Sequence, residues 1–281
     1  VKSEVAVPVE YVHIEGEVDF AIEIGLGKEN REFLSASTNL DASNQIITWE
    51  SLNEDIVKEL DHATLIITVD NGISANEAAL ICKQKGIDLI ITDHHMPPPI
   101  LPQAYAIINP KQANCPFPNI EICGAQVAWY LIGALKEVCE LRNYDMAKFL
   151  DLLTLAIIAD MMELRDLNRI LVRLGLARIN SSKRACFEAI KNYYNKEKFE
   201  FDDISFLIAP LINSAGRIDD ATISYEFLRS RNLKEANGYL DKICEFNASR
   251  KAQEKALFES SQNDIDENED ISFKISAQDK Q

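Results

Sequence analysis

The sequence contains only four histidines and ten glycines in 281 residues. It has no apolar run of the ~18 residues that crossing a bilayer requires, and its first residues, VKSEVAVPVEYV, lack the pattern of a signal peptide. The six cysteines are scattered and form no CxxC pair. Such spacing is typical of reduced thiols rather than of a disulfide framework or a zinc site. We therefore expect a cytoplasmic protein with no membrane contact.

Basic residues are outnumbered by acidic ones, so the formal net charge is −16. Proteins that bind phosphates usually carry a basic balance, so the overall charge argues mildly against a nucleic-acid partner. Bound metal ions can supply the local positive charge that a phosphate needs, and carboxylate ligands would account for some of the acidic excess. The apolar fraction of 47% predicts a globular chain with a real core. The absence of an initiator Met indicates a fragment or a processed chain.

Alternating strands and helices predict an α/β fold in the first half of the chain. Continuous apolar runs at 63–69 and 87–92 and a shorter one at 104–109 predict strands. The spacings Ser51–Glu54 and Ser74–Glu77 are typical of capping boxes that open two helices, the second ending at Gly86. A strand, helix and strand within thirty residues predict a parallel β-sheet flanked by helices.

After Pro118 the apolar spacing becomes helical, with segments expected near 123–140, 145–162, 167–180, 182–195, 202–212, 219–230 and 233–260. We expect residues 1–230 to form one catalytic domain, mainly helical over 120–230. Residues 231–260 would be a long connector helix, and 261–281 an acidic polar tail. Residues 1–12 are interpreted as a strand, whereas 13–50 give no clear pattern.

Polar residues follow directly after both long predicted strands. Asp70 follows the first, and Asp93, His94 and His95 follow the second. Parallel strands place their carboxyl ends at one edge of the sheet, which is where α/β proteins bind ligands. Asp160 lies within an otherwise apolar helical run, and a buried carboxylate needs a partner. Carboxylates and an imidazole together suit Mn²⁺ or Mg²⁺, so Asp70, His94 and Asp160 are candidate ligands.

A fourth candidate segment is LIAPLINSAGRIDDA, residues 207–221. Asn213, Ser214, Gly216 and Arg217 are expected where a helix breaks into a loop. Gly216 allows close backbone approach to an anion, and Arg217 offers a forked donor set for a phosphate. A helix C-cap followed by a new N-cap explains the same residues equally well.

These motifs together resemble the DHH phosphoesterase family, and within it the bacterial RecJ-type exonucleases specific for single-stranded DNA. The resemblance runs from about Leu60 to Lys255. It rests on LIITVDNGIS, LIITDHHMPP, AIINPKQANCPFP, CGAQVAWYL, LLTLAIIADMMEL, NRILVRLGL and IAPLINSAGRIDDA, in that order.

The resemblance implies 5′-to-3′ degradation of single-stranded DNA in recombination and repair, by a pair of Mn²⁺ or Mg²⁺ ions. It implies that Asp70 bridges the two metals, with His94 and Asp160 as further ligands. Asp93 would orient a histidine, and His95 would face the scissile phosphate. The remaining expected residues, Arg217 and Asn213, would grip a DNA phosphate.

Two features of the family have no counterpart in this sequence. The D-Y-D-x-D-G motif, which supplies two more metal carboxylates in the family, is absent, and we expect that the chain begins after it. The Gly-Gly-His signature of the second domain is absent as well. Two other functions therefore stay open. One is a phosphoesterase for small substrates such as oligonucleotides, cyclic dinucleotides or pyrophosphate. The other is a non-catalytic scaffold that binds repair or replication proteins. Nothing in the sequence implies an oligomer.

Overall fold

The computed structural model describes residues 52–60, 63–140, 144–218 and 221–262. The packing of the chain separates two compact units. The first comprises Val1–Ser182 and Glu197–Ala209, and the second comprises Lys183–Lys196 and Pro210–Gln281. The strand expected at 1–12, the unclear segment 13–50 and the acidic tail from residue 263 onward lie outside the described residues.

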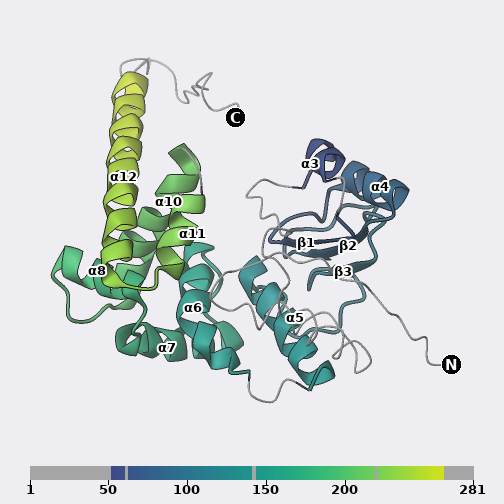
Figure 1. Cartoon of the computed structure of the whole chain (residues 1–281), viewed down its shortest axis with the longest axis horizontal. Helices are drawn as coiled ribbons and strands as arrows, with labels where there is room; N and C mark the ends of the chain where they lie inside the picture. The colour runs from purple at the N-terminus through teal and green to yellow at the C-terminus, as the bar shows by residue number, and fades with distance from the viewer. Residues whose placement is uncertain (1–51, 61–62, 141–143, 219–220, 263–281) are drawn as a thin grey trace, which may run out of the picture. The chain divides into compact units, whose positions relative to one another are not determined.

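Three parallel strands form the sheet in the described part of the first unit (Figure 1). They are β1 (Leu65–Val69), β2 (Asp88–Thr92) and β3 (Ala106–Ile108), in the order β1-β2-β3. The register pairs Val69 with Thr92 and Thr92 with Ile108, so all three strands end level with one another. The predicted parallel sheet flanked by helices is thus confirmed, with each strand slightly shorter than expected.

Helices cover both sides of this sheet. Figure 1 shows α3 (Glu54–Glu59) and α4 (Asn76–Lys85) on one side and α5 (Gly124–Val138) on the other. The core under α3 and α4 is formed by side chains from both helices and from β2 and the residue before it: Val57, Ala78, Ala79, Cys82, Ile87, Leu89 and Ile91. Continuous apolar strands are expected when both faces of a parallel sheet are buried.

The starts of α3 and α4 differ from the predicted capping boxes. Asn53 caps α3, because its side chain accepts hydrogen bonds from the Asp55 and Ile56 amides at 2.9 and 3.0 Å. The cap residue of α4 is Ala75, which has no capping side chain. The end of α4 is as predicted, since Gly86 adopts the left-handed conformation with φ 73°. A serine three residues before a glutamate was therefore insufficient to locate either helix start.

The helical part of the first unit begins with η3 (Met146–Phe149) and α6 (Leu150–Ala159), followed by α7 (Asp166–Ser181). The helices α6 and α7 pack closely at Gly175, where an added Cβ would lie 1.8 Å from Thr154 Oγ1. The short segments α9 (Phe201–Asp203) and η4 (Ile204–Ile208) complete this unit.

The second unit is helical throughout its described residues. It contains α8 (Ala185–Tyr194), nearly all of α10 (Ala209–Ile218), α11 (Thr222–Arg229) and α12 (Leu233–Gln262). The long helix expected at 233–260 is present as α12, and its role as a connector stays a prediction. No helix in the described ranges is both long and apolar enough to cross a membrane.

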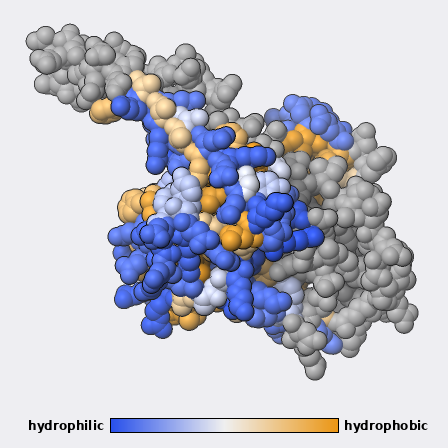
Figure 2. All heavy atoms as spheres, turned by 60° about the vertical axis from the view of Figure 1, so that its left-hand side comes forward, coloured by the Kyte–Doolittle hydropathy of each residue, from blue (hydrophilic) through white to orange (hydrophobic). Residues whose placement is uncertain are grey.

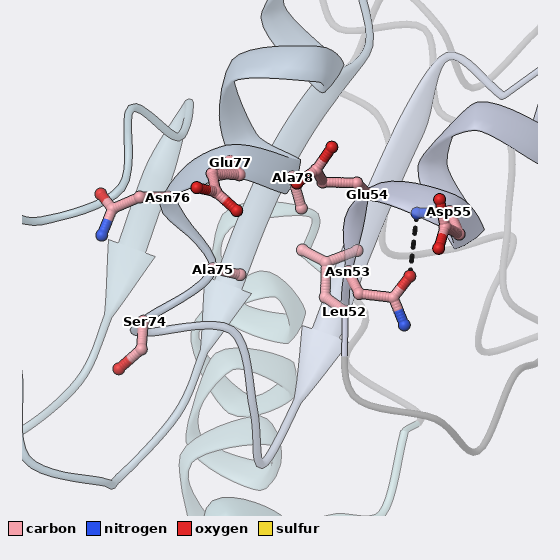
Figure 3. A pocket seen from close by; sticks show the side chains of 9 residues that line it. All are labelled: Leu52, Asn53, Glu54, Asp55, Ser74, Ala75, Asn76, Glu77 and Ala78. Atoms are coloured by element: carbon pink, nitrogen blue, oxygen red, sulfur yellow. Dashed lines mark hydrogen bonds between the residues drawn. The ribbon is translucent and has the colours of Figure 1, made fainter.

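The described surface is mostly polar. In Figure 2, hydrophilic side chains dominate the coloured part of the face shown, and hydrophobic ones form small separate patches. One surface pocket of about 590 Å³ lies at the first turns of α3 and α4 (Figure 3). Its lining includes the carboxylates of Glu54, Asp55 and Glu77, and none of the predicted site residues.

Candidate metal centre

The ends of β1 and β2 bring Asp70 and Asp93 to one edge of the sheet. The backbone ladder continues one residue past each strand, because the Asp70 amide donates to Thr92 O at 2.9 Å and the Asp93 amide donates to Ile108 O at 3.1 Å. Asp70 has a φ of 66°, in the left-handed region that is uncommon for residues other than glycine. Such strain is found most often at functional sites.

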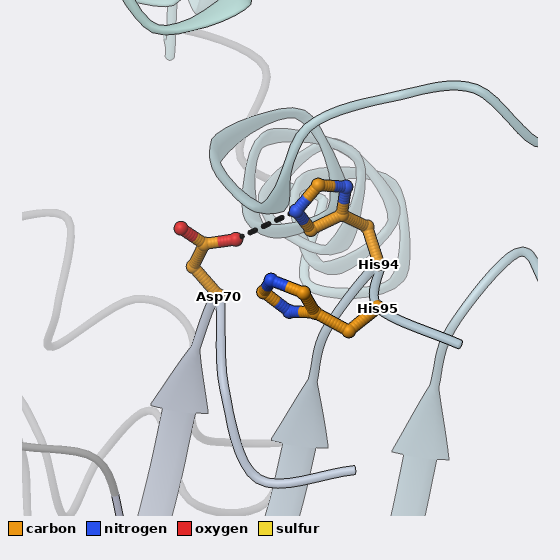
Figure 4. A group of neighbouring side chains, drawn as sticks. All are labelled: Asp70, His94 and His95. Atoms are coloured by element: carbon orange, nitrogen blue, oxygen red, sulfur yellow. Dashed lines mark ion pairs between the residues drawn. The ribbon is translucent and has the colours of Figure 1, made fainter. Parts of the chain in front are cut away.

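His94 lies between two carboxylates that are 90 residues apart in the sequence. Its Nε2 is 3.1 Å from Asp70 Oδ1 and 3.4 Å from Asp160 Oδ2. Figure 4 shows Asp70 and His94 turned toward each other above the strand ends, with His95 beside them. The convergence of Asp70, His94 and Asp160, which the parallel-strand argument predicts for the first two, is therefore present in the structure.

The buried member of this cluster is His94, whereas Asp160, which was expected to be buried, is partly exposed. Asp160 follows the last residue of α6 instead of lying within the helix, and its side chain is 40% exposed. Asp70 is 54% exposed, whereas His94 is 7% exposed. Partial burial raises the pKa of Asp70, and the charge of Asp160 raises it further, while His94 opposes both. The open carboxylates face solvent and are accessible to an ion.

Asp93 is the fully buried carboxylate, and it fixes the orientation of His95. Its Oδ2 accepts from the Ile73 amide at 2.9 Å, and its Oδ1 accepts from the His94 amide at 2.7 Å. The same Oδ1 is 2.7 Å from His95 Nδ1. Burial by itself would raise the pKa of Asp93, but these hydrogen bonds outweigh it and hold the pKa below its usual value. Asp93 is therefore an ionised anchor that leaves His95 Nε2 directed away from it.

The first turn of α5 closes the cluster on another side. Gly124, the first residue of α5, lies so close to Asp70 that a Cβ there would be 2.2 Å from Asp70 Oδ1. The neighbouring Cys123 is 2% exposed, and burial, with smaller effects from Asp160 and Asp70, raises its pKa to about 12. Gly124 was not among the predicted site residues, although it lies within the motif CGAQVAWYL.

A buried pair of amide side chains connects α5 to the turn that follows Asp160. Gln126 Nε2 donates to Asn168 Oδ1 at 2.9 Å. Asn168 Nδ2 donates to the carbonyls of Glu121 at 2.7 Å and Glu163 at 2.9 Å. Both side chains are essentially unexposed, so their hydrogen bonds form without competition from water. This amide clamp ties together the segments that position Asp70 and Asp160, and no sequence motif indicated it.

The donor set fits a divalent cation. Adjacent ligands of an octahedral ion with bonds of about 2.1 Å lie about 3 Å apart, close to the 3.1 and 3.4 Å that separate His94 Nε2 from the two carboxylate oxygens. One imidazole nitrogen cannot donate its single proton fully to two carboxylates. His94 Nδ1 is buried without a hydrogen-bond partner in the described structure. An oxygen-rich set with one imidazole suits Mn²⁺ or Mg²⁺.

The predicted phosphate-binding residues belong to the second unit. Asn213, Ser214, Gly216 and Arg217 all lie within α10, which continues to Ile218, so the expected break into a loop at these residues is wrong. Ser214 is fully buried, and its hydroxyl donates to Leu211 O at 2.6 Å and lies 3.3 Å from Ile243 O. Its hydroxyl is used in packing α10 against α12. Asn213 and Gly216 are exposed.

The fold and the cluster at the sheet edge match one family of proteins. The family model for the N-terminal domain of the DHH family matches residues 13–157. This chain belongs to the DHH family, as its motifs predict.

Its relatives within that family include the single-stranded-DNA-specific exonuclease RecJ of several bacteria. The chain is 36% identical to that of Salmonella typhimurium over 207 residues, which cover 69% of this chain and 36% of the relative. It is 37% identical to that of Bacillus subtilis over 189 residues, covering 66% and 23% respectively. The chain therefore spans about a third or less of the length of these curated relatives.

Solved structures of RecJ show the same fold. A crystal structure of Thermus thermophilus RecJ in complex with Mn²⁺ superposes with a TM-score of 0.68 at 28% identity, covering 76% of this chain and 32% of that one. A crystal structure of exonuclease RecJ bound to manganese also gives a TM-score of 0.68, at 25% identity, covering 88% and 63%.

Proposed function

We propose that this chain carries the metal-dependent hydrolytic centre of a 5′-to-3′ exonuclease that degrades single-stranded DNA. The observation that supports this most is the convergence of Asp70, His94 and Asp160, with His94 Nε2 within 3.4 Å of both carboxylates. The RecJ relatives of this chain are exonucleases specific for single-stranded DNA, and two RecJ crystal structures contain bound manganese.

Each residue has a distinct role in this proposal. Asp70, His94 and Asp160 would hold Mn²⁺ or Mg²⁺, with Asp70 as the proposed shared ligand. When bound, the metal pair lowers the pKa of a water molecule and stabilises the negative charge that develops on the phosphate. His95 reaches the phosphate or the leaving oxygen through its Nε2, because Asp93 holds Nδ1. Asn213, Gly216 and Arg217 contribute to phosphate binding.

The resemblance to the family motivates the proposed biological setting. We place the activity in DNA recombination and repair, in the cytoplasm, with repair or replication proteins as partners. The amino-acid sequence shows no counterpart of the D-Y-D-x-D-G motif. Among the described residues, Asp70, His94 and Asp160 would hold the metal, and a ring nitrogen of His95 also lies within 4.8 Å of the donor atoms of Asp70 and His94.

The test compares Asp160→Asn with Asp202→Asn, which changes an exposed aspartate of α9 in the same unit. The substrate is a single-stranded oligonucleotide with Mn²⁺, labelled at the 5′ or the 3′ end to read polarity. Loss of Mn²⁺ binding and cleavage in the Asp160 variant alone supports the proposal. Cleavage that persists at the parent rate in that variant refutes it. Preference for a dinucleotide over a long strand would instead indicate a small-substrate phosphoesterase.

A further inference from the structure

The helix α7 has a charge opposite to that of the chain as a whole. The segment 165–181 contains four arginines and a single acidic residue, Asp166, in a protein whose net charge is −16. No other described helix has so large an excess of basic residues. The proposed hydrolytic mechanism does not use this concentration of arginine.

Three of these arginines follow one another along the first half of α7. Arg169 and Arg173 are four residues apart within the helix, so they lie one above the other. Arg165 precedes Arg169 by four residues as the N-cap of α7, where the backbone is extended. All three are exposed. Arg165 lies 3.3 Å from the exposed Glu163, whereas Arg169 and Arg173 have no carboxylate partner among the described residues. We call these three residues the arginine stripe.

The arginine stripe begins beside the candidate metal centre. Arg165 follows Asp160 by five residues. The buried side of the same first turn of α7 holds Asn168, which is tied through Gln126 to the start of α5, where Gly124 touches Asp70. The start of α7 is therefore fixed relative to the cluster. Because α7 rises about 1.5 Å per residue, the stripe extends about 12 Å away from that start.

We propose that Arg165, Arg169 and Arg173 bind successive phosphates of the single-stranded DNA that leads into the metal centre. This inference rests on the proposed function. Guanidinium groups bind phosphate oxygens through paired hydrogen bonds. The stripe repeats every ~6 Å along α7, so one extended strand can bring successive phosphates to its arginines.

Apolar side chains next to the arginine stripe fit the same ligand. Ile170 is 53% exposed and lies three residues before Arg173, so these two side chains are neighbours on the surface of the helix, and Leu174, 48% exposed, lies four residues after Ile170. Surfaces that bind single strands combine a basic track for the backbone with apolar groups that contact the bases. The stripe thus offers contacts to both parts of an unpaired nucleotide.

The helix also provides a matched control, because Arg178 points to a different side of α7. It is exposed and lacks a carboxylate partner among the described residues, but it lies thirteen positions after Arg165, about 220° around the helix at 100° per residue. The test variants are Arg169→Gln/Arg173→Gln and Arg178→Gln. Each of these changes removes charge from an exposed side chain and keeps a polar group there.

Binding of a fluorescent 20-nucleotide oligo(dT) is measured by anisotropy in EDTA over a range of salt concentrations, so metal-dependent chemistry plays no part. In the double variant, the slope of the logarithm of the association constant against the logarithm of the salt concentration should become about 1.4 less steep. This corresponds to roughly 25-fold weaker binding at 0.1 M salt. Arg178→Gln should bind like the parent protein. Unchanged binding by the double variant, or an equal loss in Arg178→Gln, would overturn the inference, as would equally tight binding of polyglutamate.

A second readout separates this inference from the proposed function. A dinucleotide is too short to span the stripe. Its rate of hydrolysis with Mn²⁺ should therefore be the same in the parent and the double variant. If no protein hydrolyses any substrate, the proposed function fails, but the binding measured in EDTA still decides the role of the stripe.

Discussion

Replacing Gly124 by alanine should disable the metal centre without unfolding the protein. The new Cβ would lie 2.2 Å from Asp70 Oδ1 and 2.5 Å from Asp70 Cβ. Ordinary van der Waals contact begins near 3.4 Å, so the contact with Asp70 Cβ requires one of the two segments to move by about 0.9 Å. Rotating the carboxylate relieves only the first contact, because the Cβ of Asp70 moves only with its backbone.

The displacement can be converted into an expected effect. A misplacement of about 1 Å in a catalytic group costs on the order of 10²-fold in rate, which corresponds to about 2.7 kcal/mol of transition-state free energy. We expect Gly124→Ala to lower both Mn²⁺ affinity and Mn²⁺-dependent hydrolysis of single-stranded DNA by about that factor. Titration calorimetry and a steady-state cleavage assay measure the two quantities.

The same helix contains the control. Gly133 also lies in α5, and a Cβ there would meet only Met146 Cε at 3.9 Å. Alanine favours a helix over glycine by up to about 1 kcal/mol, so Gly133→Ala should raise the melting temperature and leave metal binding intact. Parent-like metal affinity in Gly124→Ala, or an equal loss in Gly133→Ala, would refute the reasoning.

Three further predictions concern the groups around the centre. Asn168→Asp removes the amide donors of the clamp, so the affinity for Mn²⁺ should fall at least tenfold. The control, Asn180→Asp, alters a similar amide far along α7 and should lower only thermal stability. Similar Mn²⁺ affinities of the two variants would contradict this. The pKa of Asp93 is lower in the folded protein than its ordinary value of 3.8, so ionised Asp93 stabilises the fold above pH 3.8. This stabilisation is lost as the pH falls through the lower pKa of the folded state. The stability difference between the parent and Asp93→Asn in urea titrations should therefore shrink below about pH 4, and a constant difference would be contrary evidence. With a pKa of about 12, Cys123 should resist iodoacetamide at pH 8 in the native protein while the half-exposed Cys115 reacts, as peptide mass spectrometry can check.

The sheet and its functional edge could be predicted because they depend on local patterns and one rule of topology. Continuous apolar runs identify strands that are buried on both faces. The parallel arrangement then brings Asp70 and His94 to the same edge, whatever the details of packing. Asp160 joins them because α6 ends at the preceding residue, Ala159.

The contacts that position these groups were not predictable in the same way. The approach of Gly124 to Asp70 spans 54 residues, and the hydrogen bond between Gln126 and Asn168 spans 42. Neither leaves a periodic trace in the sequence, because each depends on how separate elements pack. The predicted end of the helix before Asn213 was wrong for a related reason. The segment around Ser214 has the composition of a loop, but its burial and hydroxyl hydrogen bond to Leu211 O keep it in α10.

The central claim is that Asp70, His94 and Asp160 bind a divalent cation together. Calorimetric titration of the protein with Mn²⁺, before and after Asp160→Asn, tests it most directly, with Asp202→Asn as the control. The account predicts saturable binding in the parent and control proteins and a loss of at least tenfold in affinity in the Asp160 variant. Absence of Mn²⁺ binding in the parent protein, or binding that is unaffected by Asp160→Asn, would contradict it.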